Sequence, residues 1–245
     1  MNKIIVDDSP VLIDGKDNIY TLIIKTGNVN IKYDLKDKDY KVLVFVDFDG
    51  DVSLKEEGQI DNGSLSINYL ELKDYKFNQI CKIEALRYAS LEIKAIHLGI
   101  NDKKIDYDLI NAKEDSSVLI SNNVVCLDDS DFKMNVVGSI LKGAKRAKCH
   151  QKNRCLTIGN PKQANILPVL KIDENDVEAS HSLSSGTIDE EVLFYMNARG
   201  LNKKEALSLM VNSYLLADES FYEGFESGQD IKEKAERSIE ELCLI

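Results

Sequence analysis

The sequence is poor in histidine and cysteine, with three and five among 245 residues. The five cysteines are an odd number and lack the spacing of a disulfide framework. The first residues, MNKIIVDDSP, reach two aspartates before any long apolar run forms, so no signal peptide is expected. These features predict a cytoplasmic protein with reduced thiols.

Long apolar runs and positive charge are also scarce. No apolar stretch approaches the roughly 18 residues that a membrane-spanning helix needs, so no membrane partner is expected. The formal net charge of -11 repels a phosphate backbone, which argues against a nucleic-acid partner. The one basic cluster, residues 141–154, is expected to be a solvated turn or strand edge. Hydrophobic residues still make up 43% of the chain, enough for a large core.

Several motifs that carry chemistry are absent from the sequence. There is no phosphate-binding loop of Walker spacing and no glycine triad after a strand. The segment Ser184–Gly186 lacks the flanking glycine of a nucleophile elbow. Neither HExxH nor CxxC occurs, so a structural zinc site is poorly supported. These motifs therefore assign no catalytic residue.

What the sequence does contain is a long series of strand patterns. From Tyr20 to about Val177, short segments rich in Val, Ile, Leu and Tyr follow one another. Most alternate with period two, as Leu65, Ile67 and Tyr69 do on one face. Turns rich in Gly, Asn and Asp separate them. The pattern predicts a mainly β body, and the residues alone leave sandwich, barrel and solenoid open.

The last quarter of the chain has helical patterns. Thr187 is a candidate N-cap with Glu190 completing a capping box, and Asn202 with Glu205 repeats this arrangement. Gly200 stands where a left-handed residue ends the first helix. A third helix is expected from about residue 230 to residue 242. The chain is therefore divided into a β body, residues 1–186, and a C-terminal helical region, residues 187–245.

Four residues form a loose set of soft metal ligands: Cys149, His150, Cys155 and His181. The even spacing of Cys149 and Cys155 places both on one face if they share a strand. His181 is expected at the end of a strand, before a loop of small residues. The simpler alternative is that the cysteines are ordinary core residues and the histidine is hydrogen-bonded at the strand end.

Residues 150–215 carry a dense set of motifs. In chain order these are Gln151, Asn153-Arg154, Pro168-x-Leu170-x-Ile172, Asp176-Val177, Ala179-Ser180-His181, Gly186-x-Ile188-Asp189-Glu190-Glu191, Phe194-Tyr195, Arg199-Gly200-Leu201 and Glu205-Ala206. The segment resembles the SufB/SufD family of iron–sulfur cluster assembly proteins. The strands from about Val29 onward fit that family's β body only in pattern.

The resemblance implies a mainly β fold, namely a right-handed parallel β-helix (β-solenoid) with a small C-terminal α-helical region. It also implies a non-enzymatic scaffold role in a SUF-type complex. The implied partners are a SufC-type ABC ATPase, docked on the helical region, and a SufB-type subunit or a second copy, paired through the β-helix. The implied cofactor is a transient iron–sulfur cluster, with none tightly bound.

The resemblance also implies particular site residues. His181 matches the histidine that lies at the pairing interface of SufD-like members, where it would be a transient metal ligand. Cys155, Cys149 and Arg154 are further candidates at the cluster-assembly interface. The candidates for ATPase docking are Asp189, Glu190, Phe194, Tyr195, Arg199, Gly200 and Met210. We also expect the loop residues Phe221, Tyr222 and Phe225 to be exposed and to extend that contact. The alternative is that they pack on the protein's own helices.

Some positions depart from the family pattern. Ser182 stands where SufB has glutamate and SufD has glycine, and Asn153 aligns with an essential cysteine of SufB. The sequence therefore resembles a minimal SufD-like protein that lacks the N-terminal helical region, since the β pattern begins near residue 20. Two alternatives stay open: a degenerate homologue that only stabilises its partner, and a β-helical enzyme acting on polysaccharide. Homodimer and heterodimer also stay open.

Overall fold

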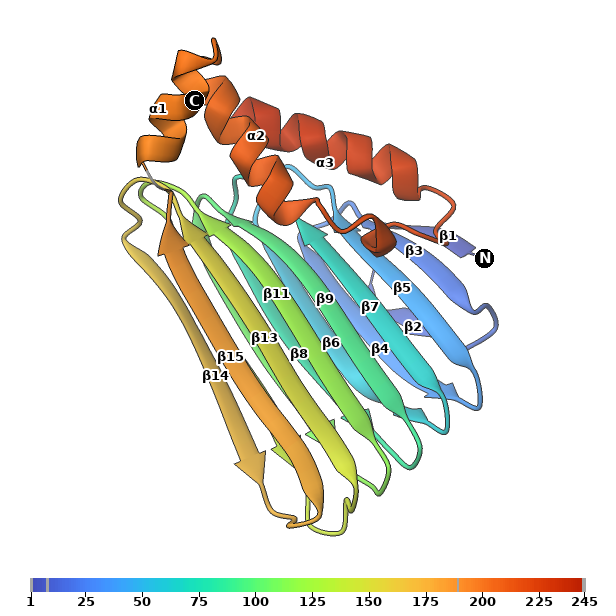
Figure 1. Ribbon diagram of the computed structural model, residues 1–245. Coiled ribbons are helices and arrows are strands. Elements are labelled where there is room, and N and C mark those ends of the chain that lie inside the picture. The colour runs from blue at the N-terminus through green and yellow to red at the C-terminus, as the bar shows by residue number, and fades with distance from the viewer. Residues whose placement is uncertain (1, 8, 189, 244–245) are drawn as a thin grey trace.

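The fold is a stack of parallel β-strands with helices on one side. The computed structural model describes residues 2–7, 9–188 and 190–243. The strands alternate between two sheets as the chain winds, so that odd-numbered strands form an eight-stranded sheet and even-numbered strands a seven-stranded sheet (Figure 1). Neighbouring strands in both sheets are parallel, as between β10 and β12. This β-solenoid confirms the solenoid among the three architectures that the strand pattern left open.

The odd-numbered sheet contains β1 Asn2–Val6, β3 Ile19–Ile24, β5 Asp39–Val46, β7 Ser64–Glu71, β9 Ser90–Gly99, β11 Ser117–Cys126, β13 Ala147–Thr157 and β15 Val177–Thr187. The even-numbered sheet contains β2 Val11–Ile13, β4 Asn28–Lys36, β6 Val52–Asp61, β8 Phe77–Ala85, β10 Asp102–Asn111, β12 Asp131–Ile140 and β14 Gln163–Ile172. Strands β1 and β2 precede Tyr20, so the prediction that the β pattern starts near residue 20 was wrong. They are too short, at five and three residues, to display a clear alternation.

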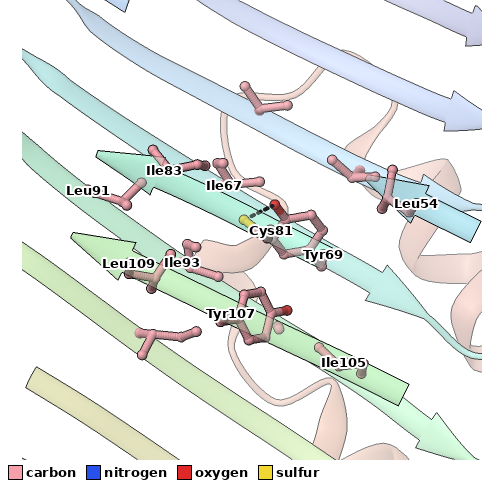
Figure 2. Packing of buried hydrophobic residues seen from close by; sticks show 14 of the residues in the cluster. Leu54, Ile67, Tyr69, Cys81, Ile83, Leu91, Ile93, Ile105, Tyr107 and Leu109 are labelled. Carbon is pink, nitrogen blue, oxygen red and sulfur yellow. Dashed lines mark hydrogen bonds between the residues drawn. The ribbon is translucent and has the colours of Figure 1, made fainter. Parts of the chain in front are cut away.

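The core of the solenoid is built from stacked rows of like side chains. Val42, Ile67, Ile93 and Ile120 occupy matching positions on successive odd-numbered strands, and all are buried. Figure 2 shows such residues meeting between the two sheets. Because side chains alternate between the two faces of a strand, every second residue of a strand points into the core and the others point outward.

Five successive corners that lead from an even-numbered strand to the next odd-numbered strand repeat a left-handed non-glycine residue. Asp37, Asn62, Tyr88, Asp115 and Arg146 have φ between 48° and 59° at successive corners. The backbone N–H of each donates to a carbonyl of the next coil, for example from Asp115 to Lys145 at 2.9 Å. Asp and Asn tolerate this conformation better than most residues, which explains the Asp/Asn-rich turns of the sequence. The corners therefore keep the coils in register.

Three α-helices follow the last strand: α1 Glu190–Ala198, α2 Lys203–Leu215 and α3 Gly228–Cys243. Asn202 and Glu205 form the predicted capping box at the start of α2. Gly200 has φ of 97° just after α1, where the left-handed residue was predicted. The third helix was correctly predicted to within about two residues. The predicted cap of α1 depends on Glu190, whose side chain lies outside the described residues.

Helices α2 and α3 cover the outer face of the odd-numbered sheet near the carboxyl ends of its strands (Figure 1). The apolar layer between these two helices and the sheet buries outward-facing strand residues such as Phe45, Leu70 and Ile96. Within the described residues, no helix is long and apolar enough to cross a bilayer. The helices thus serve as a cover for one face of the solenoid.

The loop between α2 and α3 packs into this layer rather than facing solvent. A short 3-10 turn, η1 Glu219–Phe221, begins it. Phe221, Tyr222 and Phe225 are all buried in the layer. The side-chain amide of Asn68 donates to the Phe221 carbonyl oxygen at 2.7 Å. The expectation that these aromatic residues are exposed was wrong, because they fill the space between the sheet and the helices.

Two carboxyl groups are buried among the described residues, those of Glu56 and Glu71. Glu71 forms an ion pair with Lys103, whereas Glu56 is held by neutral side chains. Glu56 is fully buried and accepts hydrogen bonds from the Tyr33 hydroxyl and the Gln79 amide, both at 2.9 Å. Burial raises the pKa of Glu56 to about 7, although these hydrogen bonds oppose the shift. The folded protein therefore holds a proton on Glu56 at pH values where the unfolded chain has lost it.

The pKa of Glu56 makes stability depend on pH. Between about pH 4.5 and 7, the contribution of Glu56 to the free energy of unfolding should fall as pH rises, by about 3 kcal/mol. Glu56→Gln mimics the protonated acid and should remove most of this dependence, as measured by urea unfolding at pH 5 and pH 8. The matched control is Glu57→Gln on the neighbouring, solvent-facing side chain. Equal pH dependence in Glu56→Gln and the wild type would contradict the assignment.

Candidate functional site

The candidate site lies at the end of the solenoid formed by β13, β14 and β15. No further coil among the described residues stacks on β15, and every residue from Ser180 to Thr187 is exposed. Strand β14 forms the edge of the other sheet and exposes Leu167. The inward face of this last coil is therefore accessible, unlike that of the coils before it.

His181 lies in the middle of β15, and the expected position at a strand end was wrong. The SLSSG segment that follows it continues the strand and does not form a loop. His181 pairs in register with the buried Gln151 of β13, so it belongs to the inward row of the last coil. Its ring has no hydrogen-bond partner within the described part of the chain, and it is exposed only because no coil covers it.

Near the open end, polar residues replace apolar ones in two inward rows: Gln151 follows Ile120 in the row of His181, and Asn122 and Asn153 lie in the row of Leu183. The Asn122 amide donates to the Asn153 side-chain oxygen at 2.7 Å, and the Asn153 amide donates to the Ser182 carbonyl at 3.1 Å. The Gln151 amide donates to the Val169 carbonyl of β14 at 3.0 Å, which ties the two sheets together. The side-chain oxygen of Gln151 is buried without a partner within the described residues. Such a group favours a further hydrogen bond from a partner or water at this end.

Cys149 and Cys155 lie on the same face of β13, as their even spacing predicted. Both are buried and point into the solenoid. Burial raises the pKa of Cys149 to about 11, so its thiol stays protonated at neutral pH. Gly138 of β12 makes room for it, because a Cβ there would lie 2.5 Å from its sulfur.

Sequence reasoning missed the thiol that lies beside Cys155. The sulfur atoms of Cys126 and Cys155 are 4.0 Å apart across β11 and β13. A hydrogen bond from the Cys126 thiol lowers the pKa of Cys155, while the same contact raises that of Cys126. Only the pairing register brings the two together, since 29 residues separate them in the chain. A strand assignment with correct register would have identified the pair.

His150 and Arg154 lie on the outer face of β13, so the structure does not gather the four soft ligands. The His150 Nδ1 atom lies 2.8 Å from the Ser180 hydroxyl. The Arg154 guanidinium stacks 4.6 Å above the Tyr214 ring of α2. No cluster of three or more His, Cys, Asp or Glu suited to a metal ion occurs among the described residues. Any metal here would need ligands from another molecule or a coordination number below three.

The candidates for docking lie on and beside α1. Phe194 and Tyr195 are exposed by 75% and 58%, and the Arg199 guanidinium lies 5.2 Å above the Tyr195 ring. Met210 of α2 is half-buried. Asp189 lies outside the described residues, as does the side chain of Glu190.

A groove connects the helices to the end of the solenoid. It has a volume of about 490 Å³. Its lining includes Arg154 from β13, Met196 from α1, and Leu209 and Met210 from α2. The groove therefore joins a candidate of the assembly site to a candidate of the docking surface.

Fold and site together define a class: a parallel β-solenoid with an uncovered terminal coil and a helical layer on one sheet. The model of the SufBD core domain, described as SUF system FeS cluster assembly, matches residues 52–214. This match extends well before the segment whose motifs carried the resemblance, and it covers more than half of the chain. The chain therefore belongs to the SufBD family of iron–sulfur cluster assembly proteins.

Individual relatives support the same assignment. The chain is 29% identical over 128 residues to the iron-sulfur cluster assembly protein SufD of Bacillus subtilis, covering 52% of this chain and 29% of that protein. It is 35% identical over 139 residues to the SufBD family protein ycf24 of Galdieria sulphuraria, covering 57% of each. It is 32% identical over 93 residues to Escherichia coli SufD, covering 38% of this chain and 22% of that protein. The chain thus spans less than two thirds of the length of these relatives.

The close packing beside Cys149 gives a prediction. Gly138→Ala should lower the free energy of unfolding by about 1–3 kcal/mol, because the new methyl group overlaps the Cys149 sulfur. Adding Cys149→Ala to this variant should restore part of the loss. Gly186→Ala is the matched control, since a Cβ there meets nothing within 4 Å. Chemical unfolding curves of the four proteins measure the effect, and equal stability of Gly138→Ala and Gly186→Ala would refute it.

Proposed function

We propose that this protein is a non-enzymatic scaffold subunit of a SUF-type complex. It pairs through its terminal coil with a SufB-type subunit or a second copy, and it docks a SufC-type ABC ATPase on α1 and α2. The iron–sulfur cluster is transient cargo built at the paired end. The observation that carries the proposal is the uncovered terminal coil, which exposes His181, together with the exposed apolar side chains of α1.

The proposed pairing rests on the exposed edge of the solenoid. Strands β14 and β15 each have one edge whose backbone groups have no neighbouring strand within the described residues. Unpaired N–H and C=O groups along an edge strand are a template for another strand. Leu167 and Leu183 add exposed apolar side chains at 52% and 45%. A partner coil stacked here would cover both.

The proposed docking surface rests on α1. This helix packs against α2 and extends beyond the sheets (Figure 1), which leaves its own apolar side chains largely uncovered. Several apolar residues are exposed by more than 40%: Val192, Phe194 and Tyr195 of α1, and Leu209 of α2. Exposed aromatic residues are enriched among the residues that anchor protein interfaces.

His181 supplies the chemistry of the proposed site. A neutral imidazole nitrogen is a suitable ligand for iron. Because one histidine cannot hold a cluster, the remaining ligands must come from the paired subunit. This requirement explains why the site is incomplete in a single chain.

The docking surface can be tested by recovery of partners. Tagged protein purified from its own cells should bring down an ABC-type ATPase, identified by mass spectrometry. Phe194→Ser combined with Tyr195→Ser should reduce ATPase recovery at least about tenfold, since loss of two interface anchors typically costs more than 1.4 kcal/mol. The matched control is Leu12→Ser, which alters an exposed residue at the other end of the solenoid. Failure to recover an ATPase at low salt would reject the docking proposal.

Pairing and cluster assembly can be separated at the terminal coil. Leu183→Lys should abolish pairing, seen as loss of the dimer by native mass spectrometry, because it buries a charge in the interface. Ile5→Lys at the opposite edge is the control and should leave the dimer intact. His181→Ala should keep the dimer but lower the iron and sulfide recovered with it.

The degenerate homologue is the second candidate function. It is favoured by Asn153, which is buried and engaged with Asn122 where SufB-like sequences carry a cysteine. Unchanged iron and sulfide in the His181→Ala dimer would support a subunit that only stabilises its partner.

A further inference from the structure

The thiols of Cys126 and Cys155 form an isolated pair inside the solenoid. Their sulfur atoms are 4.0 Å apart, and both residues are almost completely buried. They lie on neighbouring strands but not opposite each other, because Val124 pairs with Cys155 and Cys126 pairs with Thr157. The pair is therefore diagonal, one strand across and two residues along.

A direct disulfide does not suit this arrangement. Strand spacing and rise place diagonal Cα atoms roughly 8 Å apart, beyond the ~7 Å limit for a disulfide without backbone movement. The backbone here is held in the middle of the sheet by β9 and β15 on either side. At 4.0 Å the two sulfurs are in hydrogen-bond contact, and this spacing also allows them to share a metal ion.

A metal ion fits between the sulfurs. With metal–sulfur bonds of about 2.3 Å, a separation of 4.0 Å corresponds to a sulfur–metal–sulfur angle of roughly 120°. Linear coordination would need the sulfurs to separate by only about 0.6 Å more. Both geometries are within reach of small side-chain rotations of Cys126 and Cys155.

The type of ion follows from the number of ligands. Structural zinc takes four protein ligands, and no third His, Cys, Asp or Glu joins this pair within the described residues. Thiolates select soft ions, and monovalent copper is satisfied by two of them. We propose that Cys126 and Cys155 form a two-thiolate site for Cu(I). On binding, Cu(I) forms two Cu–S bonds, both thiols release their protons to solvent, and no electron is transferred.

The surroundings suit an ion that must be protected from water. A Cβ built at Gly99 would lie 3.2 Å from the Cys126 sulfur and 3.3 Å from the Phe132 ring. The side chains of Cys126 and Phe132 therefore pack directly over Gly99. On the other side, Cys155 pairs in register with Ser185 of the exposed strand β15. The small side chain of Ser185 thus separates the two thiols from the open end of the solenoid. A metal ion can enter past this side chain.

The copper site does not depend on the proposed assembly function. It shares Cys155 with the candidate assembly site, so a bound Cu(I) ion would withdraw this thiol from other chemistry at the terminal coil. Copper binding is measured on the isolated chain without partners, so failure here and failure of the scaffold proposal give different results.

The test is anaerobic titration with Cu(I) against the chromophoric chelator bicinchoninate. All proteins carry Cys243→Ala, which removes a thiol whose side chain lies outside the described residues. The protein should retain one equivalent of Cu(I). Cys126→Ala and Cys155→Ala should each weaken binding at least about 100-fold, since each removes half of the ligands.

Cys149→Ala is the matched control, because it removes another buried thiol of the same strand and should leave the affinity unchanged. If a variant does not fold, X-ray absorption of the copper-loaded protein decides, with two sulfur neighbours per copper expected. Equal Cu(I) affinity in Cys126→Ala and the parent protein would overturn the proposal, as would a sulfur count of one or three.

Discussion

The structure depends on the parallel register between successive coils. A slip of one residue between two strands would turn every inward side chain outward. The row that runs from Val42 through Ile67 to Ile93 shows that each apolar side chain rests on an equivalent one in the next coil. The same stacking leaves the last coil without a neighbour, which is why His181 is accessible while Gln151 beside it is buried. The candidate site is therefore a consequence of how the fold ends.

Polar groups inside the solenoid are tolerated because the rows satisfy one another. Glu56 is held by Tyr33 and Gln79, and Asn122 by Asn153. An unpaired buried polar group costs about 1–3 kcal/mol, so such pairs must be kept together. Near the open end, the side-chain oxygen of Gln151 is buried without a partner among the described residues.

Much of this architecture could be predicted from residue patterns. The period-two alternation predicts the strands from β3 to β14, and caps and glycine predict the helices. Three features could not be read from local sequence, because each depends on contacts between distant segments. The small residues after His181 resemble a turn, so local sequence predicts a strand end there. Nothing local shows the sheet beneath Phe221 and its neighbours, so local sequence predicts that they are exposed. Cys126 went unnoticed since only the register places it beside Cys155.

The helical layer ties the latest part of the chain to some of the earliest. Lys234 of α3 lies beside Asp47 and above the Phe45 ring, and Asn68 bonds to the Phe221 carbonyl. The outer apolar band of the odd-numbered strands stays exposed during folding until α2, α3 and the loop between them pack on it. Contacts over such sequence separations form slowly, so this hydrophobic surface is open to association with other molecules in the meantime.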